Sequence, residues 1–391
     1  MLREDIQINT IPVGDLGIIP LVSSKEMGNR VDNYLSSWRH HRKNEHINSI
    51  AFAGYIKDSY IINAATPRFG SGEAKGIIYD SVRGKDIYIL VDVCNYSVEY
   101  SLCGKPNRMS PDDHFQDLKR IVAAIGGKAK RITVIMPFLY ESRQHKRTAR
   151  ESLDCSIGLT ELYNMGIDNI ITFDAHDPRV INAEPLKGFE NIRPSYQFLK
   201  ALCREVKDIT FDEEHLMMVS PDEGAIERSV FFASVLGINM GMFYKRRDYS
   251  TVINGMNPIV AHEYLGDDLT GKDAIVVDDM ISSGGSMIDT ARDLKARGAK
   301  RVFIFSTFGL FTNGFEKFDK AYEEGLFDKV LTTNLTYQCP ELLKREYYIS
   351  VDMSKYISYI IDTLNHDASI SDLLDPTSKI NTLIENYNAE K

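Results

Sequence analysis

The chain has 391 residues, of which 43% are hydrophobic and 26% charged, a composition typical of a globular protein with two or three domains. Its net charge of −9 argues against a nucleic-acid-binding protein, because no basic surface would dominate. It has no run of roughly 20 apolar residues, no signal peptide and no Cys-x-x-Cys pair, so we expect a cytoplasmic protein without a membrane span or a zinc site.

Strand-like apolar runs alternate with helical segments along most of the chain, which predicts an α/β fold with mainly parallel sheets flanked by helices. The first series has strands within 82–93 and at 131–136 and 169–173, and a helix at 153–165. The second series has strands at 216–219, 239–243, 275–277 and 301–305, and helices at 225–236 and after 286. Two prolines near residues 185 and 194 separate the series, so we predict two domains, 1–188 and 189–391.

Polar side chains directly follow most of these strands. They are Arg143, Gln144, Asp174, His176, Asp222, Lys245 and Asp278. In open parallel sheets ligands bind just beyond the carboxyl ends of the strands. These residues are therefore the candidates for a functional site.

The segment from Ile275 to Ser286 is the most informative part of the chain. It reads as an apolar strand, the pair Asp278 and Asp279, a small loop and the start of a helix. Backbone N–H groups of 282–286 would face the space before the helix, where the helix dipole favours an anion. The loop therefore suits a phosphate monoester, and the two carboxylates suit sugar hydroxyls or a metal. A tight turn with capping Asp and Ser side chains is the simpler alternative.

This segment resembles the phosphoribosyl-diphosphate (PRPP) fingerprint, in which two acidic residues precede a small loop. Type I phosphoribosyltransferases, which consume PRPP, and ribose-phosphate diphosphokinases (PRPP synthetases), which make it, both carry this fingerprint. The resemblance implies that Asp278 and Asp279 bind ribose hydroxyls. It also implies that a five-residue loop binds the 5-phosphate of ribose 5-phosphate: Ser282, Ser283, Gly284, Gly285 and Ser286.

Lys245-Arg246-Arg247 follows a strand and precedes what reads as a loop of about two dozen residues, and long loops of this kind are commonly lids or binding loops. The run resembles the Lys-Arg-Arg sequence at the base of the catalytic loop of PRPP synthetases. The resemblance implies that Lys245 and Arg247 are catalytic. Type I phosphoribosyltransferases generally lack this combination, so it favours the synthetases.

Two segments of the first series resemble the nucleotide-binding segments of PRPP synthetases. Arg68-Phe-Gly-Ser-Gly-Glu73 is similar to the family's Phe-x-Asp-Gly-Glu, and 136–147 is similar to its segment around Arg-Gln. The resemblance implies that ATP is bound by Phe69, Ser71, Gly72, Glu73, Arg143 and Gln144. By itself, the basic run after Arg143 would be read as a solvated loop.

Two further segments resemble the metal-binding parts of the family. Thr172-Phe-Asp-Ala-His-Asp-Pro178 is similar to its Asp-Leu-His segment, and Val219-Ser-Pro-Asp-Glu-Gly224 to its Ser-Pro-Asp-x-Gly segment. The resemblance implies that His176 and Asp222 place Mg²⁺. From the residues alone, an Asx turn and a helix cap explain the two segments equally well.

The similar segments follow one another in order from about residue 66 to 375, which implies two tandem phosphoribosyltransferase-like domains. We therefore interpret the chain as a divergent PRPP synthetase that transfers the pyrophosphoryl group of ATP to ribose 5-phosphate, with Mg²⁺ as cofactor. The family forms dimers and hexamers, so we expect a homo-oligomer. Four positions depart from the family pattern: Ser71, His145, Ser282 and Phe308. A non-catalytic regulatory paralogue and a type I phosphoribosyltransferase are the alternatives.

Overall fold

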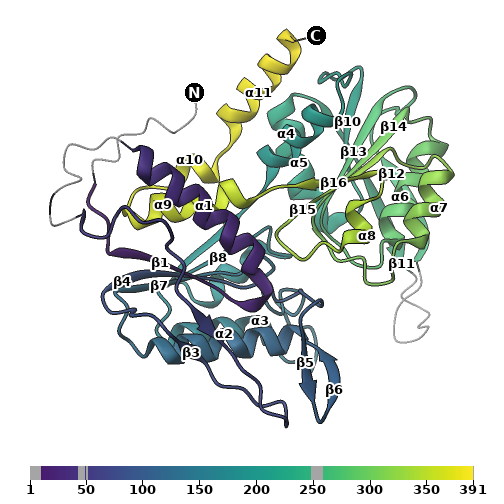
Figure 1. The fold of residues 1–391 in the computed structure, drawn as a ribbon. Coiled ribbons are helices and arrows are strands. Elements are labelled where there is room, and N and C mark those ends of the chain that lie inside the picture. Colours follow the sequence, from purple (N-terminus) through teal and green to yellow (C-terminus); the bar gives the residue numbers. More distant parts are fainter. Residues whose placement is uncertain (1–9, 43–48, 50–51, 248–258, 391) are drawn as a thin grey trace. The chain divides into compact units, whose positions relative to one another are not determined.

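A computed structural model describes residues 10–42, 49, 52–247 and 259–390, without the side chains of 245–247 and 259–262 (Figure 1). The chain forms two compact units. The first contains the residues up to Arg193 together with Leu335–Tyr337 and Asp352–Leu374, and the second contains the others. The first division between the units falls after Arg193, near the predicted domain boundary between residues 188 and 189. The division into two domains at that boundary stays a prediction.

The first unit is built on a parallel sheet with the strand order β1-β4-β7-β8-β9. Its strands are β1 (Asp15–Pro20), β4 (Lys85–Leu90), β7 (Arg131–Ile135), β8 (Asn169–Phe173) and β9 (Gly188–Ile192). Helices α1 (Lys25–His41) and α9 (Ser354–Asn365) lie on one face, and α2 (Pro111–Ile125) and α3 (Asp154–Asn164) on the other (Figure 1). Two small antiparallel pairs lie outside the sheet: β2 (Ala64–Ala65) with β3 (Ile77–Ile78), and β5 (Glu99–Leu102) with β6 (Lys105–Arg108).

The second unit is built on a seven-stranded sheet with the order β12-β11-β10-β13-β14-β15-β16. Its strands are β10 (Leu216–Ser220), β11 (Asn239–Arg247), β12 (Ile259–Leu265), β13 (Asp273–Ile281), β14 (Arg301–Gly309), β15 (Lys329–Thr333) and β16 (Tyr348–Val351). Only β12 is antiparallel to its neighbour. Helices α4 (Ser195–Glu205) and α5 (Ile226–Leu236) cover one face, and α6 (Gly285–Ala296) and α7 (Glu316–Glu323) the other (Figure 1). This unit also contains α8 (Pro340–Leu343) and α11 (Thr377–Ala389), whereas α10 (Ser371–Leu374) belongs to the first unit.

The order of this sheet reverses between β10 and β13. After β10 the chain adds β11 and β12 on one side, and β13 then returns to the other side of β10 and begins the series β13 to β16. At such a reversal the connections leave the two strands in opposite directions, so a crevice opens at their carboxyl ends. We therefore expect a ligand site at the residues that follow β10 and at the end of β13.

The predicted α/β fold is confirmed, including the unit formed by β13, α6 and β14. Two details of the prediction were wrong. The strand that we expected to stop before Asp278 continues to Ile281, and β11 continues through Lys245 to Arg247. The loop of two dozen residues that we expected after Lys245 is interrupted by β12, which pairs with β11; residues 248–258 lie outside the described part of the chain.

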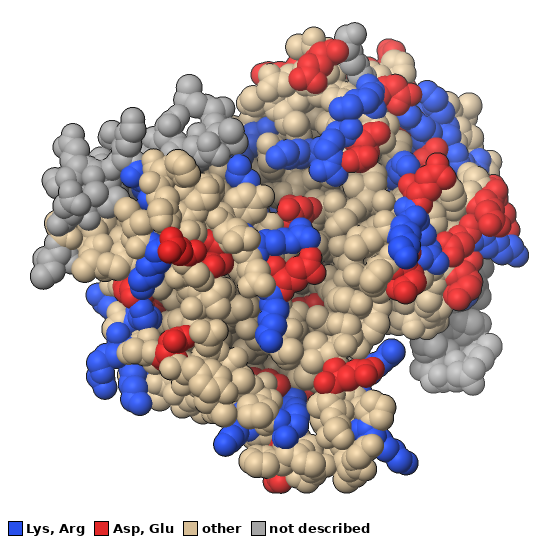
Figure 2. Space-filling model, viewed as in Figure 1, with Lys and Arg blue, Asp and Glu red and all other residues tan. Residues whose placement is uncertain are grey.

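Surface charge is mixed. Figure 2 shows Lys and Arg side chains interspersed with Asp and Glu side chains over the visible face, so no field of one sign extends across the described residues there. Among the described helices, none is both long enough and apolar enough to cross a bilayer.

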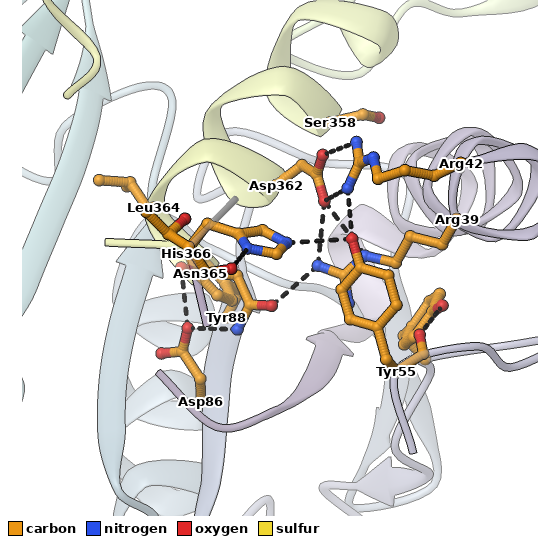
Figure 3. A network of polar contacts seen from close by, with 12 residues as sticks. Arg39, Arg42, Tyr55, Asp86, Tyr88, Ser358, Asp362, Leu364, Asn365 and His366 are labelled. Carbon is orange, nitrogen blue, oxygen red and sulfur yellow. Dashed lines mark hydrogen bonds and ion pairs between the residues drawn. The ribbon is translucent and has the colours of Figure 1, made fainter. Parts of the chain in front are cut away.

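A buried polar network holds α9, which comes from the end of the chain, within the first unit (Figure 3). Arg39 of α1 donates from Nε and Nη2 to Asp362 Oδ1, at 3.1 and 3.0 Å, and Arg42 pairs with Asp362 Oδ2. Arg39 also donates to Asn365 Oδ1 at 2.8 Å, and Asn365 Nδ2 donates to Asp86 Oδ2 at 2.9 Å. The network therefore joins α1, β4 and α9.

His366 ends this network, and its burial predicts a pH dependence of stability. Nδ1 lies 3.0 Å from the Thr10 carbonyl and therefore donates, so Nε2 accepts from the Tyr55 hydroxyl, also at 3.0 Å, and the ring is neutral. Burial lowers the pKa of His366 from 6.5 to about 4, and Arg39 and Arg42 oppose protonation while Asp362 favours it.

Between pH 6.5 and 4 the unfolded chain binds a proton that the folded chain does not, so the free energy of unfolding should fall as the pH is lowered through this window. The loss should approach about 3 kcal/mol. Urea denaturation between pH 7 and 4 measures it. A His366→Gln variant should flatten the profile, and an equally steep profile in that variant would exclude His366 as the cause.

Candidate active site

Three carboxylates meet at the carboxyl ends of β10 and β13, where the sheet order reverses. Asp278 and Asp279 lie in the last part of β13, and Asp222 follows β10. Burial, and next the carboxylates of Asp279 and Asp222, raise the pKa of Asp278 well above its ordinary value. The backbone N–H of Asp279 partly offsets this by donating to Asp278 Oδ1 at 2.9 Å. Such a concentration of negative charge favours ligands that donate hydrogen bonds, or a cation.

The phosphate loop, defined here as residues 282–286, leads from β13 into α6. Its N-cap is Gly284, which adopts φ +79°, and no side chain caps the helix. The predicted alternative, in which Asp and Ser side chains cap this helix, is therefore wrong. The first backbone N–H groups of a helix have no intrahelical acceptors, so the start of α6 presents donors and the positive end of a helix dipole. A Cβ on Gly285 would meet no atom within 4 Å, which leaves room for a ligand to approach the backbone.

Gly284 is fixed by two independent constraints, so we expect Gly284→Ala to damage the phosphate loop. Its φ is positive, and an added Cβ would lie 2.1 Å from Cε2 of Phe318 in α7. The strained backbone should lower the free energy of unfolding by about 1–3 kcal/mol. Displacement of the loop should weaken the binding of a phosphate monoester by about tenfold or more.

Gly285→Ala is the matched control for stability, because its Cβ meets open space and the residue is helical. It should leave the unfolding midpoint in urea unchanged or slightly raised. Equal destabilisation by the two substitutions would show that the Phe318 contact and the positive φ are not the reason for a glycine at 284.

Lys245 and Arg247, the predicted catalytic residues, lie in the last part of β11. The backbone of Lys245 pairs with His262 of β12, and a register shift falls between Arg246 and Arg247. Their side chains lie outside the description, as does the segment 248–258. Their assignment to catalysis stays a prediction from the sequence.

In the first unit, the nucleotide hairpin, defined as residues 68–74, holds four of the predicted nucleotide-binding residues. A turn closed by Phe69 N–H to Glu73 O and Gly72 N–H to Phe69 O, at 2.7 and 2.9 Å, leaves the Phe69 ring 54% exposed. Ser71 Oγ donates to Glu73 Oε2 at 2.9 Å. The hairpin therefore presents an aromatic face and an oriented carboxylate side by side.

The other predicted residues of this unit follow β7 and β8. Arg143 is exposed, whereas the Gln144 amide donates to the Ser152 and Lys146 carbonyls of its own loop, at 2.8 and 3.2 Å. Gln144 therefore fastens its loop, and Arg143 is the better placed of the two for a phosphate contact.

His176 is exposed and packs edge-on against His145, with the ring centroids 5.6 Å apart. His145 Nε2 lies 3.1 Å from Asp177 Oδ2 without hydrogen-bond geometry. Hydrogen bonds from Arg179 are the main reason that the pKa of Asp177 lies far below its usual range. Asp177 is therefore ionised and held by Arg179. Its side chain also caps the turn that starts at Pro178, which is the Asx turn predicted as the alternative for this segment.

The described residues include no group of three His, Cys, Asp or Glu side chains that could hold a metal by themselves. Asp222 Oδ1 accepts from Gly224 N at 3.0 Å, which confirms the predicted cap. The mutual repulsion of Asp222, Asp278 and Asp279 nevertheless fits a divalent cation. Mg²⁺ commonly binds through one or two carboxylates together with substrate phosphates and waters, and the residues present fit that mode.

The sequence interpretation missed the side chains that support these loops. Phe318 packs under Gly284, and the β5–β6 hairpin packs against Gly72 through Leu102. The signal for β5–β6 was weak, because both strands have only four residues and Lys105–Arg108 has no apolar alternation and contains a proline.

Comparison with known proteins agrees with this arrangement. Residues 16–166 match the family described as the N-terminal domain of ribose phosphate pyrophosphokinase, and residues 188–324 match the phosphoribosyl transferase domain. Ribose-phosphate pyrophosphokinase of Vibrio cholerae is 28% identical over 314 residues, covering 79% of this chain and 90% of the relative. The Pasteurella multocida enzyme of that name is also 28% identical, over 313 residues, with the same coverage.

Among solved structures, phosphoribosylpyrophosphate synthetase from Mycobacterium smegmatis has the same fold. The two structures superimpose with a TM-score of 0.71, and their sequences are 19% identical. The match covers 90% of this chain and 100% of the Mycobacterium smegmatis chain. The likeness confirms the predicted fold of two tandem phosphoribosyltransferase-like domains. The matches to both domain families, in order and along most of the chain, show that this protein belongs to the ribose-phosphate pyrophosphokinase family.

Proposed function

We propose that this chain is a ribose-phosphate diphosphokinase, which converts ribose 5-phosphate and ATP into PRPP and AMP. The observation that carries the proposal is the phosphate loop, which lies directly beside Asp278 and Asp279 at the point where the sheet order reverses. An uncapped helix start suits the 5-phosphate, and the carboxylates suit the ribose hydroxyls.

The nucleotide would be bound by the nucleotide hairpin and by Arg143. Phe69 would stack on the adenine ring, and Glu73, which Ser71 orients, would accept from its amino group or from the ribose. Arg143 would donate to phosphate oxygens. Gln144 would act through its loop rather than by direct contact.

In the reaction, the 1-hydroxyl oxygen of ribose 5-phosphate attacks the β-phosphorus of ATP, and AMP leaves with the oxygen that bridged the α- and β-phosphorus atoms. Lys245 and Arg247 would stabilise negative charge on the transferring group, because such catalysis relies on positioning and charge stabilisation. The family resemblance assigns one Mg²⁺ ligand to each unit: His176 in the first and Asp222 in the second. When bound there, Mg²⁺ would neutralise charge on the ATP phosphates.

The alternatives predict different chemistry. A type I phosphoribosyltransferase would consume PRPP with a nucleobase or another acceptor, and a non-catalytic paralogue would release no AMP. The matches to both domain families, with a similar enzyme along most of the chain, favour the synthetase.

A substrate comparison tests the proposal. Purified protein with ATP and Mg²⁺ should release AMP when ribose 5-phosphate is added, and should release almost none with ribose, which lacks the phosphate that the loop would bind. AMP release that does not depend on the 5-phosphate would contradict the assignment of the phosphate loop.

A further inference from the structure

The β5–β6 hairpin forms a two-stranded sheet of its own. It is an isolated antiparallel pair, Tyr100 lies opposite Asn107, and Leu102 lies opposite Lys105. Its two-residue turn is Cys103-Gly104, with φ +50° and +78°. Positive φ at both positions is the geometry that joins two strands with their natural twist, so the hairpin is a formed element and not a loose excursion.

The tip of this hairpin contacts the nucleotide hairpin. Cys103 N–H donates to the Gly70 carbonyl at 2.8 Å. Leu102 packs against Gly72, where an added Cβ would lie only 2.7 Å from Leu102 Cδ1. Gly70 and Gly72 alternate with Phe69, Ser71 and Glu73 along the nucleotide hairpin. The tip therefore supports the backbone from which the predicted nucleotide contacts project.

A second connection runs through Arg68 at the base of the nucleotide hairpin. Its guanidinium lies 4.8 Å from the centroid of the Tyr100 ring, and its Nη2 donates at 2.9 Å to Asp117 Oδ2 of α2. Asp117 is buried, and the side chain of Arg68 is 9% exposed. Asp117 thus fixes Arg68 to a rigid helix, and Tyr100 stacks on the fixed guanidinium.

An open pocket of about 280 Å³ lies beside these contacts. Arg68 and Tyr100 line it, together with Pro67, Val98 and Met109. The described contacts between the two hairpins are therefore the tip contact and the packing of Tyr100 against Arg68 and Gly72. Loss of either contact should therefore loosen the backbone of the nucleotide hairpin.

We propose that the β5–β6 hairpin positions the nucleotide hairpin for ATP, with Leu102 and Tyr100 as positioning residues. The inference rests on the proposed function, because it assumes that residues 69–73 contact the nucleotide. It goes beyond that function by assigning ATP affinity in part to side chains that do not touch ATP.

The test compares Leu102→Ala with Lys105→Ala, its exposed partner across the hairpin. Leu102→Ala should raise the KM for ATP by about fivefold, with kcat and the KM for ribose 5-phosphate within about twofold of wild type. Lys105→Ala should change none of these, and Leu102→Met, which keeps the contact, should restore the KM for ATP. Unchanged KM for ATP in Leu102→Ala would overturn the proposal.

Hydrogen exchange separates this proposal from the proposed function. In Leu102→Ala the backbone amides of Phe69, Gly72 and Cys103 should exchange about tenfold faster, whether or not the protein makes PRPP. A wild-type protein that releases no AMP would refute the proposed function. Faster exchange in Leu102→Ala would still support the positioning contact. Unchanged exchange at these three amides would refute the positioning role even in an active enzyme.

Discussion

Lys245→Ala is expected to lower kcat by about 10²–10³-fold, because an ammonium that meets charge developing in the transition state is lost. The KM values for ATP and ribose 5-phosphate should change much less, since the contact forms mainly in the transition state. Initial rates of AMP release at saturating substrate measure the effect. Unfolding in urea should be unchanged, because Lys245 lies at the end of β11.

Arg246→Ala is the matched control for Lys245→Ala. It removes a positive charge from the neighbouring residue, which the family resemblance does not assign to catalysis. Its kcat should stay within about threefold of wild type, as expected for a charge that makes no transition-state contact. Equal losses in the two variants would indicate that only the net charge of this strand matters, and an unaffected Lys245→Ala would show that the catalytic residue is elsewhere.

Asp362→Ala is expected to cost about 3–5 kcal/mol of stability, because it leaves the guanidinium of Arg39 buried without its carboxylate. Arg39 is 1% exposed and Asp362 4% exposed, so water cannot replace the lost partner. Arg42 pairs with the same carboxylate, so the substitution affects two cations. Urea denaturation of the full chain at pH 7 measures the loss.

Glu26→Ala provides the control, because its ion pair with Arg30 lies on the exposed surface of the same helix, α1. It should change stability by less than about 1 kcal/mol. If Asp362→Ala cost no more than Glu26→Ala, the buried network would not be what holds α9 within the first unit.

The sequence predicted the sheet cores and the phosphate loop because local patterns determine them. Met287, Ile288, Ala291 and Leu294 have the spacing of one helical face, and all four are buried in α6. Gly298 lies just beyond the end of α6, where glycine is typical, and adopts φ +89°. The acidic pair lies near the end of β13 and the glycine loop follows this strand directly, so their proximity needed no long-range contact.

No helix or strand was predicted before residue 82, and the composition of α1 gives a physical reason. Helix α1 buries Gly28, Asp32 and Arg39 together with its apolar residues, so its core-facing side does not look apolar in sequence. Asp32 accepts from the Tyr60 N–H and Arg39 pairs with Asp362, partners that only the folded chain brings together.

The extent of β11 was misjudged for a related reason. Lys-Arg-Arg reads as the start of a loop, but backbone pairing with β12 keeps the segment extended whatever its side chains are. The return of 352–374 to the first unit is likewise a tertiary effect. Asp362 meets an arginine that precedes it by more than 300 positions, and no local pattern reports such a contact.

The most direct test of the account is ³¹P NMR of a reaction that contains the protein, ATP, ribose 5-phosphate and Mg²⁺. Attack on the β-phosphorus predicts AMP and a diphosphate ester at carbon 1 of the sugar in equal amounts, with the 5-phosphate retained. Formation of ADP with a single phosphate on carbon 1, or no consumption of ATP, would contradict the proposed function.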